Sequence, residues 1–197
     1  MDVVTPFARH EDVVVPLHGR HQSANAATAL VAVEAFFDRA LDDAVVADGM
    51  AQVVVPGRCE VMSRAPLIVL DGAHNPQGAQ ALAATFREEF DVPGRLVMVI
   101  GMLEGRDVAD MLRSLSVTEA DLVIATRPPS PRAIPSEDLA AVARAMGVLV
   151  EQVDDVSTAV GRAIDVSTSD DAVLVAGSLY VVGAARTAVT RLLRAGD

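Results

Sequence analysis

The chain has 197 residues, of which 51% are hydrophobic and 3% aromatic, and its net charge is −11. This length gives room for one good-sized domain and part of another, and the acidic charge argues against nucleic acid or an anionic membrane as a partner. No apolar run is long enough to span a bilayer, the first residues lack the features of a signal peptide, and the single cysteine, Cys59, fits a reducing compartment, so we expect a cytoplasmic protein.

The first part of the chain is predicted to be mostly helical. Residues 13–16 have the apolar character of the end of a strand. An alanine-rich helix is expected from residue 22 to about 39, and a second helix from residue 43 to about 54. Pro56 and Gly57 then interrupt the pattern, so we place a boundary between residues 1–55 and residues 56–197.

From residue 56 onward, short apolar runs alternate with helical patterns. Strands are expected at residues 59–63, 67–70, 96–100, 122–126, 148–153 and 172–176, and helices at 76–90, 107–115, 136–146, 156–166 and 180–194. Near-continuous apolar strands are typical of a sheet that is buried on both faces. We predict an α/β fold with a mostly parallel Rossmann-like sheet and helices on both faces. The runs 67–70, 97–100, 122–125 and 173–176 should be its neighbouring buried strands.

Residues 67–78 form the most informative segment. An apolar run ends in Asp71, a glycine turn follows, and Asn75 and Pro76 are the residue types preferred at a helix cap and at the first helical position. In an open α/β sheet, ligands bind beyond the carboxyl ends of the strands, where a helix start offers N–H groups to an anion. A carboxylate at a strand tip suits ribose hydroxyls, whereas His74 and the helix start suit phosphate.

The sequence Asp71-Gly72-Ala73-His74-Asn75-Pro76 in this setting resembles a motif of the C-terminal domain of folylpolyglutamate synthase/dihydrofolate synthase, a branch of the Mur ligase superfamily. Further segments are similar to motifs of this family and keep the same order: Gly19 to Ala27, Pro56-Gly57-Arg58-Cys59-Glu60, Gly101 to Asp107, and Ala176 to Gly183. The resemblance runs over nearly the whole chain but covers only the later half of the family's usual architecture.

The resemblance implies that residues 1–55 are a remnant of the central ATPase domain, and that residues 56–197 are the Mur ligase C-terminal glutamate ligase domain. It implies an ATP-dependent ligase of folate biosynthesis, which activates a folate or pteroate carboxyl as an acyl phosphate and joins it to L-glutamate. The chain has no glycine-rich phosphate loop, and all 16 basic residues are arginine. We therefore expect the missing N-terminal ATPase domain to supply that loop and the Mg²⁺ ligands, and the isolated chain to be inactive.

By the same resemblance, four residues would contact the nucleotide. Asn25 would face the adenine, Asp71 would accept the ribose hydroxyls, and Arg58 would reach the phosphates. His74 would lie near the phosphates as a donor or positioning group, with a catalytic role. Simpler interpretations remain: Asn25 as a solvated amide, Arg58 as a surface cation at a domain boundary, and Asp71 as a turn former. His74 alone is ambiguous.

Arg106 and Ser178 are, by resemblance, candidates for binding the carboxylates of the incoming glutamate, and Arg106 is also a catalytic candidate. Arg106 stands where the family usually has lysine, which keeps the charge but changes the geometry. No spacing of His, Cys and carboxylates indicates a metal site, and His10 is expected at the surface. Cys59 is expected to be a packing residue, and the proline-rich segment 127–132 indicates a functional edge.

The topology also predicts how these residues meet. Asp71, His74 and Ser178 follow strand ends, and Arg106 lies in the turn after another strand, so all of them should share one cleft on the carboxyl edge of the sheet. Arg58 should approach this cleft from the hinge.

Two functional hypotheses remain. The first is the C-terminal part of a monomeric folylpolyglutamate synthase-like ligase, and the second is an autonomous, non-catalytic nucleotide-binding or interaction domain derived from that family. We favour the first, for which the upstream reading frame should encode a phosphate loop.

Overall fold

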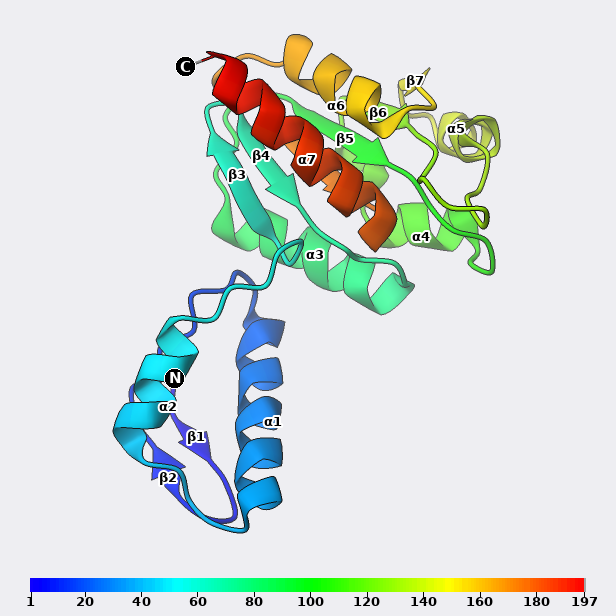
Figure 1. Ribbon diagram of the computed structural model, residues 1–197. Helices are drawn as coiled ribbons and strands as arrows, with labels where there is room; N and C mark the ends of the chain where they lie inside the picture. Colours follow the sequence, from blue (N-terminus) through cyan, green and yellow to red (C-terminus); the bar gives the residue numbers. More distant parts are fainter. Residues whose placement is uncertain (197) are drawn as a thin grey trace. The chain divides into compact units, whose positions relative to one another are not determined.

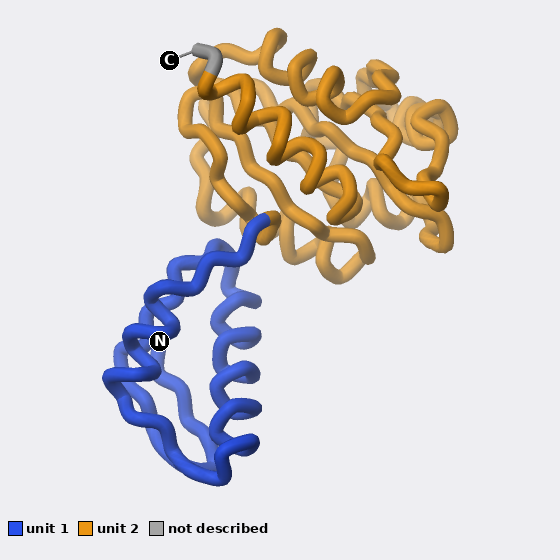
Figure 2. Tube along the Cα trace, in the orientation of Figure 1, with its two compact units in different colours: residues 1–56 blue, residues 57–197 orange. Residues whose placement is uncertain are grey.

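The structure is a computed structural model that describes residues 1–196. The chain divides into two compact units, residues 1–56 and residues 57–197 (Figure 2).

The first unit contains two short antiparallel strands and two helices (Figure 1). Strand β1 (Val3–Val4) pairs with β2 (Arg9–His10), and helices α1 (Arg20–Phe37) and α2 (Asp43–Ala51) follow. Both helices were predicted. The strand predicted at residues 13–16 is wrong, because these residues have no strand partner in the described part of the chain. The two short strands were missed because two residues carry too little alternation to be recognised.

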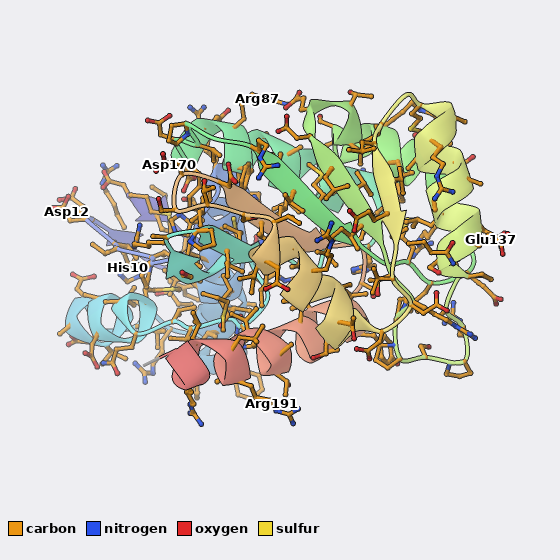
Figure 3. All side chains as sticks on the ribbon, turned by 90° about the horizontal axis from the view of Figure 1, so that it is seen from above. His10, Asp12, Arg87, Glu137, Asp170 and Arg191 are labelled. Carbon is orange, nitrogen blue, oxygen red and sulfur yellow. The ribbon has the colours of Figure 1, made fainter. Side chains whose placement is uncertain are left out.

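His10 is buried, not exposed as predicted. Its side chain is 1% exposed, and it is labelled in Figure 3. Nε2 lies 2.9 Å from Oε1 of Glu34, and Nδ1 lies 2.6 Å from Oδ1 of Asp43. Ionised carboxylates only accept hydrogen bonds, so this arrangement favours the imidazolium form, in which both ring nitrogens carry protons. The hydrogen bond with Glu34 is the largest cause that raises the pKa of His10 above its ordinary value. His10 therefore ties β2 to both helices.

The second unit contains a six-stranded sheet in the order β3-β4-β8-β5-β6-β7. The strands are β3 (Glu60–Arg64), β4 (Leu67–Leu70), β5 (Leu96–Ile100), β6 (Leu122–Ala125), β7 (Val150–Gln152) and β8 (Ala172–Ala176). Only β3 runs antiparallel to its neighbour, β4, and the other pairings are parallel. The four predicted apolar runs are the adjacent strands β4, β8, β5 and β6, so the α/β prediction is confirmed.

Helices cover both faces of this sheet, as Figure 1 shows. They are α3 (Pro76–Glu89), α4 (Val108–Ser114), α5 (Ser136–Ala145), α6 (Val156–Asp165) and α7 (Leu179–Gly196), with a short 3₁₀ helix, η1 (Val117–Glu119), that was not predicted. Successive strand residues point to opposite faces. Met98 and Ile100 belong to the core under α3, α4 and α5, whereas Val97 and Val99 belong to the core under α6 and α7.

Candidate active site

The tips of the central parallel strands approach each other closely at the carboxyl edge of the sheet. The Gly177 amide, after β8, donates to the carbonyl of Ala73, after β4, at 3.1 Å. Gly177 has a φ of 107°, and a Cβ at this position would lie 2.6 Å from the carbonyl oxygen of Gly101, after β5. Glycine is needed here because of both this backbone conformation and this close approach.

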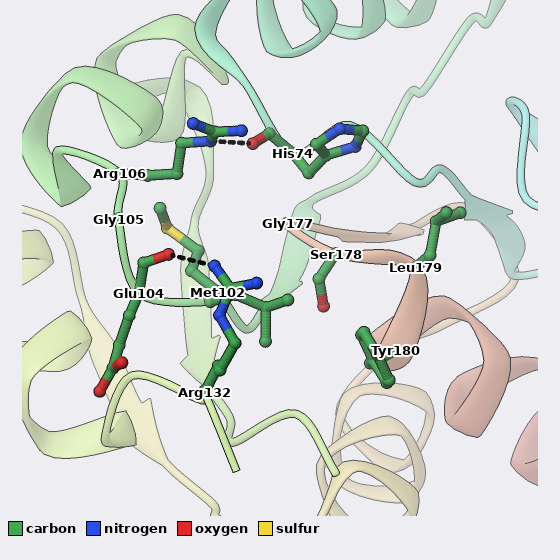
Figure 4. Close-up of a pocket in the computed structure, with 11 residues that line it drawn as sticks. His74, Met102, Glu104, Gly105, Arg106, Arg132, Gly177, Ser178, Leu179 and Tyr180 are labelled. Carbon is green, nitrogen blue, oxygen red and sulfur yellow. Dashed lines mark hydrogen bonds between the residues drawn. The ribbon is translucent and has the colours of Figure 1, made fainter. Parts of the chain in front are cut away.

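A pocket of about 270 Å³ opens at this edge (Figure 4). It is lined by His74, Met102, Leu103, Glu104, Gly105, Arg106, Arg132, Gly177, Ser178, Leu179 and Tyr180. The structure therefore brings together three of the predicted residues, His74, Arg106 and Ser178. Asp71 does not line this pocket, so the structure does not bring it together with the other three there, and its place in a common cleft stays a prediction.

Asp71 instead faces the turn that precedes β3. Its carboxylate is buried and accepts hydrogen bonds from the amides of Cys59 at 2.8 Å and Ala73 at 2.7 Å. The Gly72 amide donates to the carbonyl of Gly57 at 2.8 Å, which holds the same turn. Asp71 is thus a turn former in this structure, and its predicted contact with ribose stays a prediction.

Arg58 lies on the turn that Asp71 holds. Its side chain is half-buried, and the following residue, Cys59, has a left-handed backbone with a φ of 47°. Since Glu60 at the start of β3 pairs with Leu70 at the end of β4, this turn lies at the carboxyl edge of β4. Burial is the largest cause that raises the pKa of the Cys59 thiol, to about 12, which fits its predicted packing role.

His74 has a fixed tautomer. Its Nδ1 lies 2.9 Å from the carbonyl oxygen of Gly72, which can only accept a hydrogen bond, so Nδ1 carries a proton. Nε2 is then the nitrogen that remains for a ligand. The next residue, Asn75, caps α3 by accepting a hydrogen bond from the amide of Gly78 at 2.8 Å, and Pro76 begins the helix, both as the sequence predicted.

Arg106 and Arg132 bring positive charge to the pocket from two loops. Arg106 follows β5, and its Nε donates to the carbonyl of His74 at 3.1 Å. Arg132 belongs to the loop after β6, which is joined to the β5 loop by a hydrogen bond of 2.8 Å from the Glu104 amide to the Arg132 carbonyl. The sequence pointed to segment 127–132 as a functional edge but did not single out Arg132.

Ser178 and Tyr180 complete the pocket at the start of α7. The Ser178 side chain is 1% exposed, and its hydroxyl accepts a hydrogen bond from the Val181 amide at 3.2 Å. Tyr180 is half exposed. Tyr180 belongs to one of the motifs in the sequence, but no role was predicted for it.

Asn25 lies in α1 of the first unit. Its side chain is exposed, and its Nδ2 donates to Oε1 of Gln22 at 3.0 Å. The predicted contact with adenine stays a prediction.

Within residues 1–196, no group of three or more His, Cys, Asp and Glu side chains is arranged to hold a metal ion. Of the helices described, none combines the length and the apolar character required to cross a membrane.

Comparison with known proteins identifies the second unit. The family described as the Mur ligase, glutamate ligase domain, matches residues 57–179. The chain is 42% identical over 201 residues to the dihydrofolate synthase/folylpolyglutamate synthase of Mycobacterium tuberculosis (strain ATCC 25618 / H37Rv). This match covers 90% of the chain but only 40% of that relative's length.

Solved structures agree with this result. The Mycobacterium tuberculosis folylpolyglutamate synthase complexed with ADP and AMPPCP matches with a TM-score of 0.85 at 37% identity, over 94% of this chain and 43% of that one. A bifunctional folylpolyglutamate synthase/dihydrofolate synthase with Mn, AMPPNP and L-glutamate bound matches with a TM-score of 0.77 at 30% identity, over 96% of this chain and 43% of that one. The chain therefore belongs to the Mur ligase family and contains its C-terminal glutamate ligase domain, of the kind found in folylpolyglutamate synthase/dihydrofolate synthase.

Proposed function

We propose that this chain is the C-terminal part of an ATP-dependent ligase that joins L-glutamate to the carboxyl group of a folate or pteroate. The observation that carries the proposal is the pocket at the carboxyl edge of the sheet, where Arg106, Arg132 and Ser178 lie together beside His74. The pocket would hold the incoming amino acid, and the groups around His74 and Asp71 would hold the nucleotide.

The charge of the pocket suits a dicarboxylic amino acid. The chain has a net charge of −11, yet this pocket is lined by two arginines, Arg106 and Arg132, and by one acidic residue, Glu104. A guanidinium binds a carboxylate through two parallel hydrogen bonds, so two of them can bind the two carboxylates of L-glutamate. The Ser178 hydroxyl can donate a further hydrogen bond. Holding the amino acid by both carboxylates would leave its amino group free to attack the activated acceptor.

The nucleotide would be held by groups on the β4 side of the same edge. His74 presents Nε2, and the first turn of α3 begins two residues after it. Arg58 lies on the turn that is fixed to the tip of β4. ATP would supply the phosphoryl group that activates the acceptor carboxyl. Since the described residues contain no cluster of metal ligands, we expect the Mg²⁺ ligands elsewhere in the full enzyme.

The first unit fits a role as part of a larger domain. Its core consists of Val3, Val13, Leu30 and Val46, with a few half-buried neighbours. Helix α1 also carries Phe36, which is 83% exposed, and Phe37, which is 54% exposed. Two large exposed aromatic side chains at the end of one helix indicate a surface that another segment covers. We propose that residues 1–55 belong to the central ATPase domain, whose remaining part carries the phosphate loop.

The test is a ligation assay with labelled L-glutamate, ATP, Mg²⁺ and either a pteroate or a folate acceptor. We expect no product from the purified chain alone, and product when the N-terminal ATPase part of a relative is fused to it. The same fusion carrying Arg132→Ala should lose most of its activity at low glutamate. A well-folded fusion that is inactive with every acceptor would refute the proposal and favour a non-catalytic domain.

A further inference from the structure

A hydrogen bond connects Arg106 in the amino-acid pocket to the backbone of His74, and what we infer from it rests on the proposed function. In the sheet order, β8 lies between β4 and β5. The loop after β4 carries His74 and the loop after β5 carries Arg106, so these loops do not belong to adjacent strands. The Arg106 side chain nevertheless connects them, because its Nε donates to the His74 carbonyl at 3.1 Å (Figure 4).

This hydrogen bond uses only one edge of the guanidinium. Among the described residues, neither terminal nitrogen of Arg106 has a hydrogen-bond or ion-pair partner, and the side chain is exposed at the pocket. The two terminal nitrogens form a pair of donors that can still bind a carboxylate in a fork while Nε is engaged. One planar group can therefore bind a ligand carboxylate and the His74 backbone at the same time.

The backbone of His74 in turn determines where its ring lies. The ring is held by Nδ1 on the Gly72 carbonyl at 2.9 Å, within the same turn. A change in the peptide that follows His74 therefore moves the ring and its Nε2. Since a guanidinium is rigid and planar, a carboxylate bound to its terminal nitrogens also fixes the direction of its Nε–H.

We propose that Arg106 is a positioning residue that transmits occupancy of the amino-acid pocket to the His74 ring. When a carboxylate binds, the guanidinium is immobilised, its hydrogen bond to the His74 carbonyl strengthens, and Nε2 is held in one place. Arg132 lines the same pocket but contacts the Glu104 carbonyl at 3.4 Å, so it binds ligand without this connection.

The test follows the His74 ring by NMR while L-glutamate is added to the complete chain. The protein is labelled at histidine, which occurs at four positions, and the His74 signal is assigned with His74→Gln. We expect the His74 ring signal to shift with saturation by L-glutamate. Arg106→Lys keeps the cation but has no Nε–H, so it should bind L-glutamate within about 10-fold of the wild type and lose the His74 response.

Arg132→Lys is the matched control. It should weaken L-glutamate binding and still give the full His74 shift at saturation. Binding of L-glutamate without a His74 shift in the wild type, or an unchanged shift in Arg106→Lys, would overturn this inference and leave the proposed function standing. Absence of L-glutamate binding both by the chain and by its fusion to the N-terminal ATPase part would overturn the two together.

Discussion

Replacing Asp71 by alanine should destabilise the second unit, in addition to any effect on a nucleotide. The carboxylate is 6% exposed and accepts hydrogen bonds from the amides of Cys59 and Ala73, which are themselves buried. Asp71→Ala leaves both amides without this acceptor. It also releases the turn at residues 57–59, where Cys59 has a φ of 47°.

The expected loss can be worked out from these two hydrogen bonds. A buried donor that loses its acceptor costs about 1–3 kcal/mol, so Asp71→Ala should lower the free energy of unfolding by about 2–6 kcal/mol. Asp71→Asn keeps one carbonyl oxygen and should cost about 1–3 kcal/mol, since one amide still has an acceptor. Asp155→Ala is the matched control, because Asp155 caps α6 by accepting from Thr158 but is exposed. Loss of such a cap costs about 0.5–2 kcal/mol.

The measurement is urea unfolding followed by tyrosine fluorescence. The chain has one tyrosine and no tryptophan, and Tyr180 lies in the second unit, so the signal reports this unit alone. If Asp71→Ala costs no more than Asp155→Ala, the carboxylate does not hold the turn and the reasoning is refuted. If the loss is as large as expected, nucleotide binding by Asp71→Ala must be measured under conditions in which the variant is still folded. Only then can weaker binding be attributed to a lost contact with ribose.

Three further predictions concern other parts of the chain. Gly177→Ala should lower the free energy of unfolding by at least about 1–3 kcal/mol, because alanine is strained at a φ of 107° and its Cβ would clash with the Gly101 carbonyl. An unchanged midpoint of urea unfolding would contradict this. Val175→Asp should lower the free energy of unfolding by more than about 3 kcal/mol or prevent folding, since Val175 is fully buried in β8 and a carboxylate there has no partner. A stable protein with a native circular dichroism spectrum would contradict the buried sheet. The raised pKa of His10 means that the folded chain holds this proton more tightly than the unfolded chain, so its stabilising effect is complete below about pH 6.5 and is lost as the pH rises through the raised pKa. Calorimetry should show the first unit becoming less stable as the pH rises above about 6.5, and His10→Gln should remove most of that slope.

The fold of the second unit could be predicted because its strands carry their own signal. Runs such as Leu67–Leu70 and Ala172–Ala176 are apolar throughout and end at glycine or acidic residues, which a doubly covered sheet requires. The helix start at Asn75 and Pro76 could be predicted for the same reason, because its signal lies within a few neighbouring residues. Sequence could not give the strand order, because nothing in β8 itself shows that it inserts between β4 and β5.

The candidate site was predictable in part for the same reason. His74, Arg106 and Ser178 follow strand ends, and topology alone places them on one edge. Arg132 was missed because the loop after β6 turns back to pair Ala133 with Leu103, a long-range contact that no local pattern reveals. His10 was predicted at the surface because its partners lie 24 and 33 residues away in the sequence.

The strand order also explains why an arginine suits position 106. Two strand spacings separate β4 from β5, which is about 10 Å in the plane of the sheet. A side chain on the β5 loop must be long to reach the His74 carbonyl, and lysine and arginine are the long cationic side chains. Lysine carries all its donors on one terminal nitrogen, whereas arginine has a further N–H at Nε, along its stem. Arg106 can therefore span the tip of β8, contact the His74 carbonyl and still present two terminal nitrogens to a carboxylate in the pocket.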